Sequence, residues 1–446
     1  MLLNSMLFIW LFLPVSIVLY YLSDQKYKKL ILAFFSIFFW FFNDPKLMPV
    51  LFLFSFITYF IGIWMEKSAQ KKKMLLTAGI VINLMVLCLY KYIVSPMPVA
   101  ISFVSFSLIS YLVDIYQQKA PAQKNIVSYI LYIAFFPKLL MGPIELYRNF
   151  SAELESNKTE YNDALFGNGL TKFISGFAKK VLIADMLAPA ANKVFMQGAS
   201  LSTGAAWLGV FAYTLQIYFD FSGYSDMAIG TAEMFGYHLH DNFHYPYLSV
   251  SLTDFWRRWH ISLGTWFKNY LYFPLGGSRK GKFRTYINLF IVFLATGIWH
   301  GSGLTFVIWG IYNGIIVVLE RMFLLPRIKD SKVKVLWNLY ALVVIAFGWI
   351  IFRSNDLNQF FHIINVMFSN TSGELTVASL MNKRILIAFI TGVLGCGYIQ
   401  LLFSRIGIHK LSENIIFRII VLVILFGLSV LATVNSTFSA FIYAQF

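Results

Sequence analysis

A histidine at position 300 stands in the sequence TGIWHGSG, residues 296–303, directly after an apolar run. An imidazole removed from water must find polar partners or destabilise the fold, so a histidine in such a place needs a reason. Desolvation lowers the pKa of a histidine, which keeps the ring neutral and able to accept a proton. A hydroxyl is a poor nucleophile until a base removes its proton, and His300 could be that base. The alternative is that His300 is a packed polar residue.

A second group of polar residues lies between residues 235 and 284, where no apolar run is long enough to span a bilayer. His260 stands there in the sequence TDFWRRWHIS, and spacing alone does not show whether it meets His300. A helix over residues 252–271 would carry its apolar side chains on one face, which predicts an interfacial helix. That face consists of Leu252, Trp256, Trp259, Leu263, Trp266, Phe267 and Tyr270.

Three aspartates accompany these histidines. Asp254 stands just ahead of the hydrophobic run, where an aspartate usually caps a helix, although it could instead orient a histidine. Asp220 and Asp226 flank the sequence FSGYS near the end of an apolar segment. Carboxylates within a membrane usually have a charged partner, so we expect a structural ion pair with Arg257 or Arg258 rather than acid–base catalysis.

The composition identifies an integral membrane protein. Of its 446 residues, 59% are hydrophobic and 13% are charged, and such a chain cannot hide its apolar surface in a water-soluble core. Crossing a hydrocarbon core of about 30 Å takes about 20 apolar residues. The clearest runs lie near residues 6–22, 27–43, 47–65, 74–94, 204–222, 303–325, 335–352, 385–403 and 412–434. Tilted or re-entrant segments are expected near 101–116, 126–144, 168–188, 285–300 and 357–368.

These elements predict an all-α polytopic membrane protein, with about eleven transmembrane helices plus re-entrant and interfacial helices around a central cavity. We expect one membrane domain over residues 1–446, with an interfacial and catalytic segment at about 235–314. The first apolar run has no basic start and no cleavage site, so it is interpreted as a retained span. Cys88 and Cys396 lie in apolar runs and are expected to be packed free thiols.

Charge indicates orientation. Lysines follow the first and third spans, whereas the loops after the second and fourth spans carry little charge. The N-terminus is therefore predicted to face outward. The formal net charge of +16 is scattered over loops as topology determinants, so we expect no nucleic-acid partner.

Four ordered sequence blocks resemble the membrane-bound O-acyltransferase family. They are YTLQIYFDFSGYSDMAIG (213–230), NFHYPYLSVSLTDFWRRWHISLGTWFKNYLYFPLGGSRKG (242–281), GIWHGSGLTFVIWGIYNG (297–314) and the closing FIYAQF (441–446). The block order, the PLGGSRKG loop, the tail and the upstream sequence FFPKLLMGPIELY (135–147) are similar to the bacterial branch that contains alginate and peptidoglycan O-acetyltransferases.

The resemblance implies transfer of an acyl group from a thioester to a hydroxyl, with His300 at the position of the family's active-site histidine. His260 matches a second histidine of this branch, and it would orient the acceptor, polarise the thioester carbonyl or support the site structurally. The candidate supporting residues are Trp299, Asp254, Asp220 and Asp226.

Three further features carry hypotheses. The glycine-rich sequence LGGSRKG contributes Arg279 and Lys280 and precedes Lys282; these donors could bind coenzyme A phosphates, although a cytoplasmic anchoring loop has the same composition. Tyr443, in the terminal FIY sequence, could carry an acetyl group as a covalent intermediate or could anchor the tail at the membrane surface; Ala444 departs from the aromatic residue common there. The sequence HLHDNFH (238–244) offers metal ligands without a second cluster, so we expect no metal.

The expected function is that of an O-acetyltransferase in the bacterial cytoplasmic membrane. Acetyl-CoA would be the donor substrate, with no permanently bound cofactor, and a cell-envelope or exported polysaccharide would be the acceptor. Besides membrane lipids, the family resemblance implies a periplasmic or surface acetyltransferase as the partner, since the chain shows no GxSxG-type nucleophile domain of its own. The alternatives are D-alanyl transfer to teichoic acid and, from another class, a multi-span transporter with buried His and Asp residues.

Overall fold

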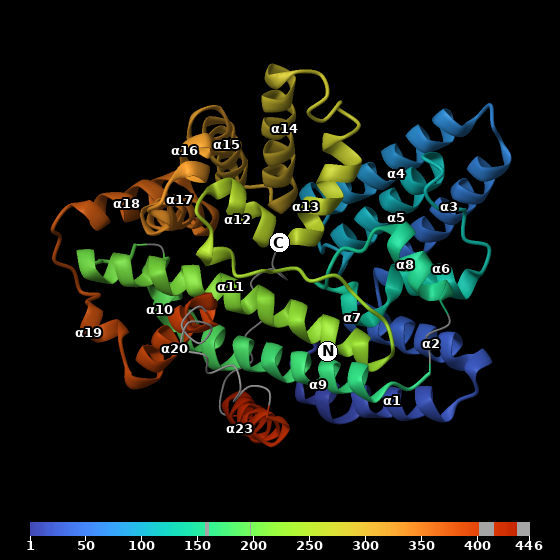
Figure 1. The fold of residues 1–446 in the computed structure, drawn as a ribbon, viewed down its shortest axis with the longest axis horizontal. Coiled ribbons are helices and arrows are strands. Elements are labelled where there is room, and N and C mark those ends of the chain that lie inside the picture. The colour runs from blue at the N-terminus through green and yellow to red at the C-terminus, as the bar shows by residue number, and fades with distance from the viewer. Residues whose placement is uncertain (157–159, 197, 401–413, 435–446) are drawn as a thin grey trace. The chain divides into compact units, whose positions relative to one another are not determined.

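The computed structural model describes residues 1–446 apart from 157–159, 197, 401–413 and 435–446 (Figure 1). The described residues form helices joined by loops, and they contain no β-strand. The two isolated backbone bridges recorded among them join Leu201 to Leu375 and Phe243 to Trp259. The predicted all-α fold is therefore confirmed.

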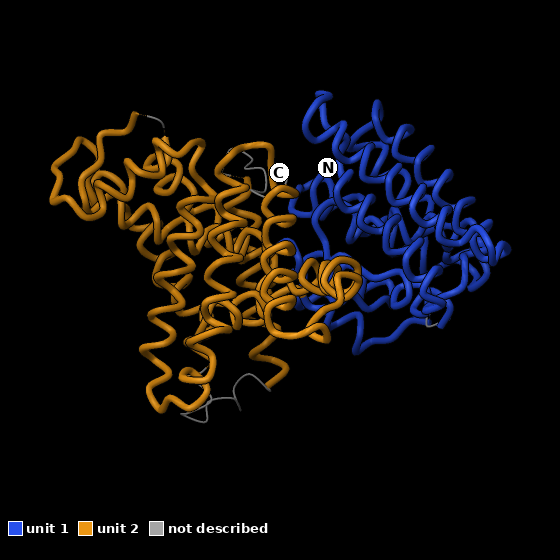
Figure 2. Tube along the Cα trace, turned by 90° about the horizontal axis from the view of Figure 1, so that it is seen from above, with its two compact units in different colours: residues 1–173, 224–241 blue, residues 174–223, 242–446 orange. Residues whose placement is uncertain are grey.

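The chain divides into two compact units, and the first comprises residues 1–173 and 224–241 (Figure 2). Within it, α6 begins where the Asn125 side chain accepts hydrogen bonds from the backbone N–H groups of Val127 and Ser128. Cys88, predicted to be packed, is exposed on α4. The helices that lie wholly in this unit are η1 (Phe8–Phe12), α1 (Leu13–Leu22), α2 (Gln25–Asn43), α3 (Met48–Lys67), α4 (Lys72–Tyr92), α5 (Ile101–Tyr116), α6 (Ile126–Ala134), α7 (Phe136–Leu139) and α8 (Tyr147–Glu155).

The second unit comprises residues 174–223 and 242–446. Two long helices, α9 (Asp163–Ala178) and α11 (Thr203–Met234), contribute residues to both units. The helices that lie wholly in unit 2 are η2 (Lys179–Ala184), α10 (Asp185–Val194), η3 (Pro246–Leu248), α12 (Leu252–Arg258), α13 (Ile261–Phe267), η4 (Lys268–Tyr272), α14 (Lys282–His300), α15 (Leu304–Leu319), η5 (Glu320–Leu324), α16 (Leu325–Asp330), α17 (Lys334–Arg353), α18 (Leu357–Phe368), α19 (Val377–Leu380), α20 (Lys383–Val393), η6 (Leu394–Tyr398) and α23 (Ile415–Val434).

Five helices in the described part of the chain are long and apolar enough to cross a membrane. Each of them matches one of the spans predicted from the sequence. Shorter apolar helices occupy other predicted positions, so the total of about eleven crossings stays a prediction. The five long helices are Met48–Lys67, Lys72–Tyr92, Leu304–Asp330, Lys334–Arg353 and Ile415–Val434.

Glycines bring α14 and α15 into backbone contact in unit 2 (Figure 1). A Cβ atom on Gly297 would lie 2.5 Å from the carbonyl oxygen of Phe306, and one on Gly310 would lie 2.6 Å from that of Phe293. Side chains at either position would push the helices apart, as at other close helix crossings in membranes. Because the hairpin turns directly after His300, this packing determines where the end of α14 lies.

The prediction of one continuous helix over residues 252–271 is wrong. The chain forms α12, breaks at Trp259 and His260, and resumes as α13 and η4. His260 has φ 46° and ψ 52°, a left-handed conformation that an α-helix cannot contain. The break is paired with residues 242–244, since the His244 N–H donates to the Arg258 carbonyl and the Ile261 N–H donates to the Asn242 carbonyl. Helical periodicity cannot show such a tertiary pairing.

The apolar face of residues 252–271 was predicted to contact lipid headgroups, but much of it is buried inside the protein. Trp259, Leu263, Trp266 and Phe267 are buried, with between 1% and 6% of each residue exposed. The Trp259 ring packs 5.0 Å from the Trp349 ring of α17. These side chains therefore form part of the core of unit 2, instead of the expected contact with lipid headgroups.

Candidate active site

His300 and His260 line the same cavity of unit 2, which has a volume of about 70 Å³. His300 is the last residue of α14, and His260 lies at the break between α12 and α13. Only 3% of each residue is exposed. The cavity is about as large as a few water molecules, so it can admit the reacting end of a substrate but not a whole coenzyme. The other lining residues are Trp256, Trp259, Leu263, Gly264, Phe267, Val292, Phe293 and Thr296.

Aromatic rings hold the imidazole of His300. The rings of Trp309 and Phe352 each lie 5.1 Å from it and nearly perpendicular to it, and the half-buried Trp299 ring lies 4.6 Å away. Gly301 completes this packing, since a Cβ atom there would lie 2.4 Å from the Phe306 ring. The ring of His300 is thus held in one orientation, as a base directed at one hydroxyl requires.

The backbone conformation of His260 and the neighbouring Phe221 ring restrict its imidazole. Burial lowers its pKa to about 3, so the imidazole is neutral at physiological pH. Its segment lies outside the five candidate membrane spans of the described residues. The Phe221 ring of α11 packs 4.7 Å from the imidazole. A non-glycine residue in a left-handed conformation costs about 1–3 kcal/mol and persists where its surroundings determine it, which is typical of functional sites.

Asn242 positions the segment next to His260, a role that the sequence analysis does not predict. Its buried side-chain oxygen accepts hydrogen bonds from the backbone N–H of Ser262 at 3.1 Å and from the Ser262 hydroxyl at 3.0 Å. Together with the bond from Ile261 to the Asn242 carbonyl, this contact fixes the start of α13 next to His260. The only signal in the sequence is a lone asparagine in a loop, which does not reveal the partner.

The prediction that Asp254 caps α12 is wrong. Ser251 is the N-cap residue, and its hydroxyl oxygen accepts from the Asp254 N–H at 2.9 Å. The Asp254 carboxylate accepts from the Val250 N–H at 3.3 Å and from the Arg258 side chain at 3.0 Å. Asp254 therefore supports the first turn of α12 from inside the helix.

The predicted arginine partners of Asp220 are also wrong. The Lys180 ammonium lies 2.7 Å from an Asp220 oxygen and 2.7 Å from an Asp185 oxygen. We call Lys180, Asp185 and Asp220 the Lys180 cluster. Asp226 lies further along α11, in unit 1, where its charge acts on Lys172. Neither aspartate lines the histidine cavity.

The basic loop and the other histidines of the described residues do not line the cavity. Arg279 and Lys280 are exposed in the turn that precedes α14, and Lys282 is exposed at the first residue of α14. His240 contacts the buried Glu145 carboxylate at 2.7 Å through its ring Nδ1 atom, within unit 1. Tyr443 lies outside the described residues.

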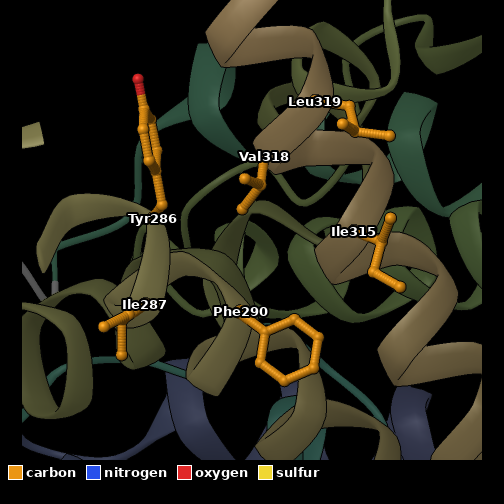
Figure 3. Close-up of a pocket in the computed structure, with 6 residues that line it drawn as sticks. All are labelled: Tyr286, Ile287, Phe290, Ile315, Val318 and Leu319. Carbon is orange, nitrogen blue, oxygen red and sulfur yellow. The ribbon is translucent and has the colours of Figure 1, made fainter. Parts of the chain in front are cut away.

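A second hollow, on the α14–α15 hairpin, contrasts with the histidine cavity (Figure 3). Tyr286, Ile287 and Phe290 of α14 line it. The Tyr286 hydroxyl points away from the other labelled side chains, so the hollow presents carbon atoms only. It offers no group that could accept a proton from a substrate. The α15 residues that line it are Ile315, Val318 and Leu319.

Comparison with known proteins gives a consistent result. Residues 34–360 match the model of the membrane-bound O-acyltransferase family. The probable alginate O-acetylase of Pseudomonas aeruginosa is 38% identical over 436 residues, covering 90% of this chain and 81% of the relative. The peptidoglycan O-acetyltransferase of Helicobacter pylori is 33% identical over 82% of this chain and 80% of the relative. The teichoic acid D-alanyltransferase of Bacillus subtilis is 28% identical over 56% of this chain and 66% of the relative.

Proposed function

The chain belongs to the membrane-bound O-acyltransferase family and is a multi-pass membrane acyltransferase. On that premise, we propose that it transfers acetyl groups from acetyl-CoA to a polysaccharide, either of the cell envelope or exported from the cell. The observation that carries this proposal is the shared cavity of His300 and His260. It supplies two buried imidazoles and room for the end of a thioester. The names of the two O-acetyltransferase relatives support acetyl as the acyl group and a polysaccharide as the acceptor.

His300 is the base in this proposal. It takes the proton from the acceptor hydroxyl while the hydroxyl oxygen attacks the thioester carbonyl. A carbon–oxygen bond forms and the carbon–sulfur bond breaks, and the proton then passes from His300 to the departing coenzyme A thiolate. His260, which burial keeps neutral, orients the hydroxyl or donates a hydrogen bond to the carbonyl oxygen as it gains charge.

The donor reaches the cavity from the cytoplasm, and the acetyl group leaves toward the outside of the inner membrane. Arg279, Lys280 and Lys282 are proposed to bind the phosphates of the coenzyme, because exposed donors on a glycine-rich turn can adapt to an anion. The N-terminus is proposed to face outward. A periplasmic or surface acetyltransferase is the proposed partner that passes acetyl to the polymer.

The decisive experiment uses the purified full-length protein in nanodiscs. A transferase releases free coenzyme A from acetyl-CoA when an acceptor is supplied, and acetyl appears on the acceptor. A transporter instead moves substrate across a liposome membrane without consuming the thioester. Turnover with a D-alanyl carrier protein, and none with acetyl-CoA, would favour the teichoic acid alternative. Absence of thioester consumption with every donor would refute the proposal.

The role of Tyr443 needs a separate experiment in cells. If its phenol carries the acetyl group, Tyr443→Phe abolishes acetylation of the external polymer, while acetyl-CoA still releases coenzyme A when a small acceptor is supplied. Unchanged polymer acetylation would leave the residue as a membrane anchor.

A further inference from the structure

Glu320 is a fully buried carboxylate at the end of the apolar helix α15. It begins η5, the π-helical turn that follows α15. A carboxylate in such surroundings needs several hydrogen bonds. One oxygen, Oε1, accepts from the Leu252 backbone N–H at 2.6 Å. The other, Oε2, accepts from the Thr253 backbone N–H at 2.7 Å and from the Thr253 hydroxyl at 2.6 Å.

These donors are the first two residues of α12. The first N–H groups of a helix have no acceptor within the helix, so another group must supply one. Glu320 supplies it for Leu252 and Thr253, and Ser251 supplies it for Asp254. The other end of α12 lies just before His260. A residue distant in sequence thus defines where the helix that leads to His260 begins.

The same helix, α15, contacts the middle of α12 and the ring of His300. The Trp256 indole N–H donates to the Asn313 side chain at 3.2 Å, seven residues before Glu320 and so on the same face of α15. The Trp309 ring lies 5.5 Å from the Trp256 ring and 5.1 Å from the His300 ring. One face of α15 therefore contacts α12 at two levels and contacts His300 as well.

We propose that Glu320 is a positioning residue, whose carboxylate fixes the start of α12 so that His260 faces the cavity that it shares with His300. The left-handed conformation of His260 supports this role, because such a conformation needs fixed neighbours on both sides. Asn242 fixes the side toward α13, and Glu320 fixes the far end of α12. The link to catalysis rests on the function proposed above, whereas the link to geometry does not.

Thiol labelling tests the geometry without any need for activity. In a Cys88→Ser, Cys396→Ala background, the His260→Cys variant carries one buried thiol, and its alkylation rate by a small maleimide is measured in the full-length protein. Adding Glu320→Ala is expected to raise that rate at least tenfold, because α12 loses the acceptor for two of its amides. Glu320→Gln is expected to raise it less, since its amide oxygen still accepts.

A matched control separates local movement from general loosening. Thr296→Cys places the thiol on α14, in the lining of the same cavity, and its rate is expected to be unchanged by either Glu320 substitution. Equal rates at position 260 with and without Glu320 would overturn the proposal, as would parallel increases at positions 260 and 296. If Glu320→Ala does not fold, the same comparison with Glu320→Gln decides.

Kinetics adds a second readout. Glu320→Gln is expected to lower kcat about tenfold with little change in KM, and to have no further effect in the His260→Gln background, because two changes that act through one group are not additive. Additive losses would overturn the proposal. If the parent protein transfers no acetyl group while the labelling result holds, the proposed function fails and the positioning role of Glu320 stands.

Discussion

Unit 2 contains two buried polar regions that differ in how their charge is balanced. In the Lys180 cluster, the ammonium contacts two carboxylates at 2.7 Å each, so charges are held by opposite charges. In the histidine cavity, two imidazoles lie among aromatic rings, and space remains beside them. Charges bound to one another resist proton exchange because breaking the pair is costly. A neutral imidazole beside a cavity can accept a proton from a substrate that enters it.

The largest effect is expected in the histidine cavity. His300→Ala should lower acetyl transfer by about 10²- to 10⁴-fold, the usual contribution of a general base. The protein should still insert and keep its melting temperature within a few degrees, because the rings of Trp309 and Phe352 that pack against the imidazole remain in place. Coenzyme A release and thermal unfolding in detergent measure the two properties. Near-normal turnover would remove the base assignment.

A substitution in the Lys180 cluster should lower the free energy of unfolding more than it lowers acetyl transfer. Lys180→Met leaves the buried Asp220 and the partly buried Asp185 without their cation and should destabilise the protein by about 3–5 kcal/mol. The exposed Lys193→Met on α10 is the matched control and should change stability by less than about 0.5 kcal/mol. Denaturant unfolding compares them. Normal stability combined with lost transfer would assign the cluster to the reaction and remove the contrast between the two regions.

Most apolar helices could be predicted from the sequence, whereas the contacts between distant segments could not. The apolar runs matched helices because burial in lipid is encoded in local composition. The sequence does not predict the pairing of residues 242–244 with the break at His260. Helical and strand periodicity describe a single segment, whereas this pairing joins two segments of the chain. The sequence offers Arg257 or Arg258 as the partner of Asp220, but the partner is Lys180, which lies in η2.

The same limit applies to the candidate site. His300 and His260 were identified from residue type and family resemblance, and neither source indicated that they line one cavity. Asp254 was assigned as the cap of α12 because aspartate is common there, whereas Ser251, three residues earlier, makes the capping bond. Glu320 had a signal, a lone carboxylate in an apolar helix, but only the fold reveals that it binds the start of α12.

A pH experiment sharpens the comparison through His260. Its pKa is about 3 in the folded protein, against about 6.5 when unfolded, so only the unfolded chain takes up this proton as the pH falls from 6.5 to 5. The free energy of unfolding should therefore drop by about 1.6 kcal/mol over that range on account of His260, because half of the unfolded chains already carry the proton at pH 6.5. His260→Gln should remove this part of the decline, as measured by unfolding at both pH values.

His240 is a control, because its pKa is shifted in the opposite direction from that of His260. The hydrogen bond with Glu145 raises its pKa, so its contribution to stability is present at acidic pH and is lost as the pH rises through the folded-state pKa. His240→Gln should consequently make the decline from pH 6.5 to 5 steeper. A decline that is the same in the parent and the His260→Gln protein would mean that His260 is hydrated rather than buried.

The smallest effect is expected at Asp254. Its contact with Arg258 joins two partly exposed side chains four residues apart, and such pairs contribute about 0.3–0.5 kcal/mol. Asp254→Asn should thus leave transfer within about twofold of the parent and change stability by less than about 1 kcal/mol. Ser251→Ala is the matched control and should cost about 1 kcal/mol, because it removes the capping bond. A tenfold loss of transfer in Asp254→Asn at unchanged stability would instead indicate that this carboxylate orients a histidine.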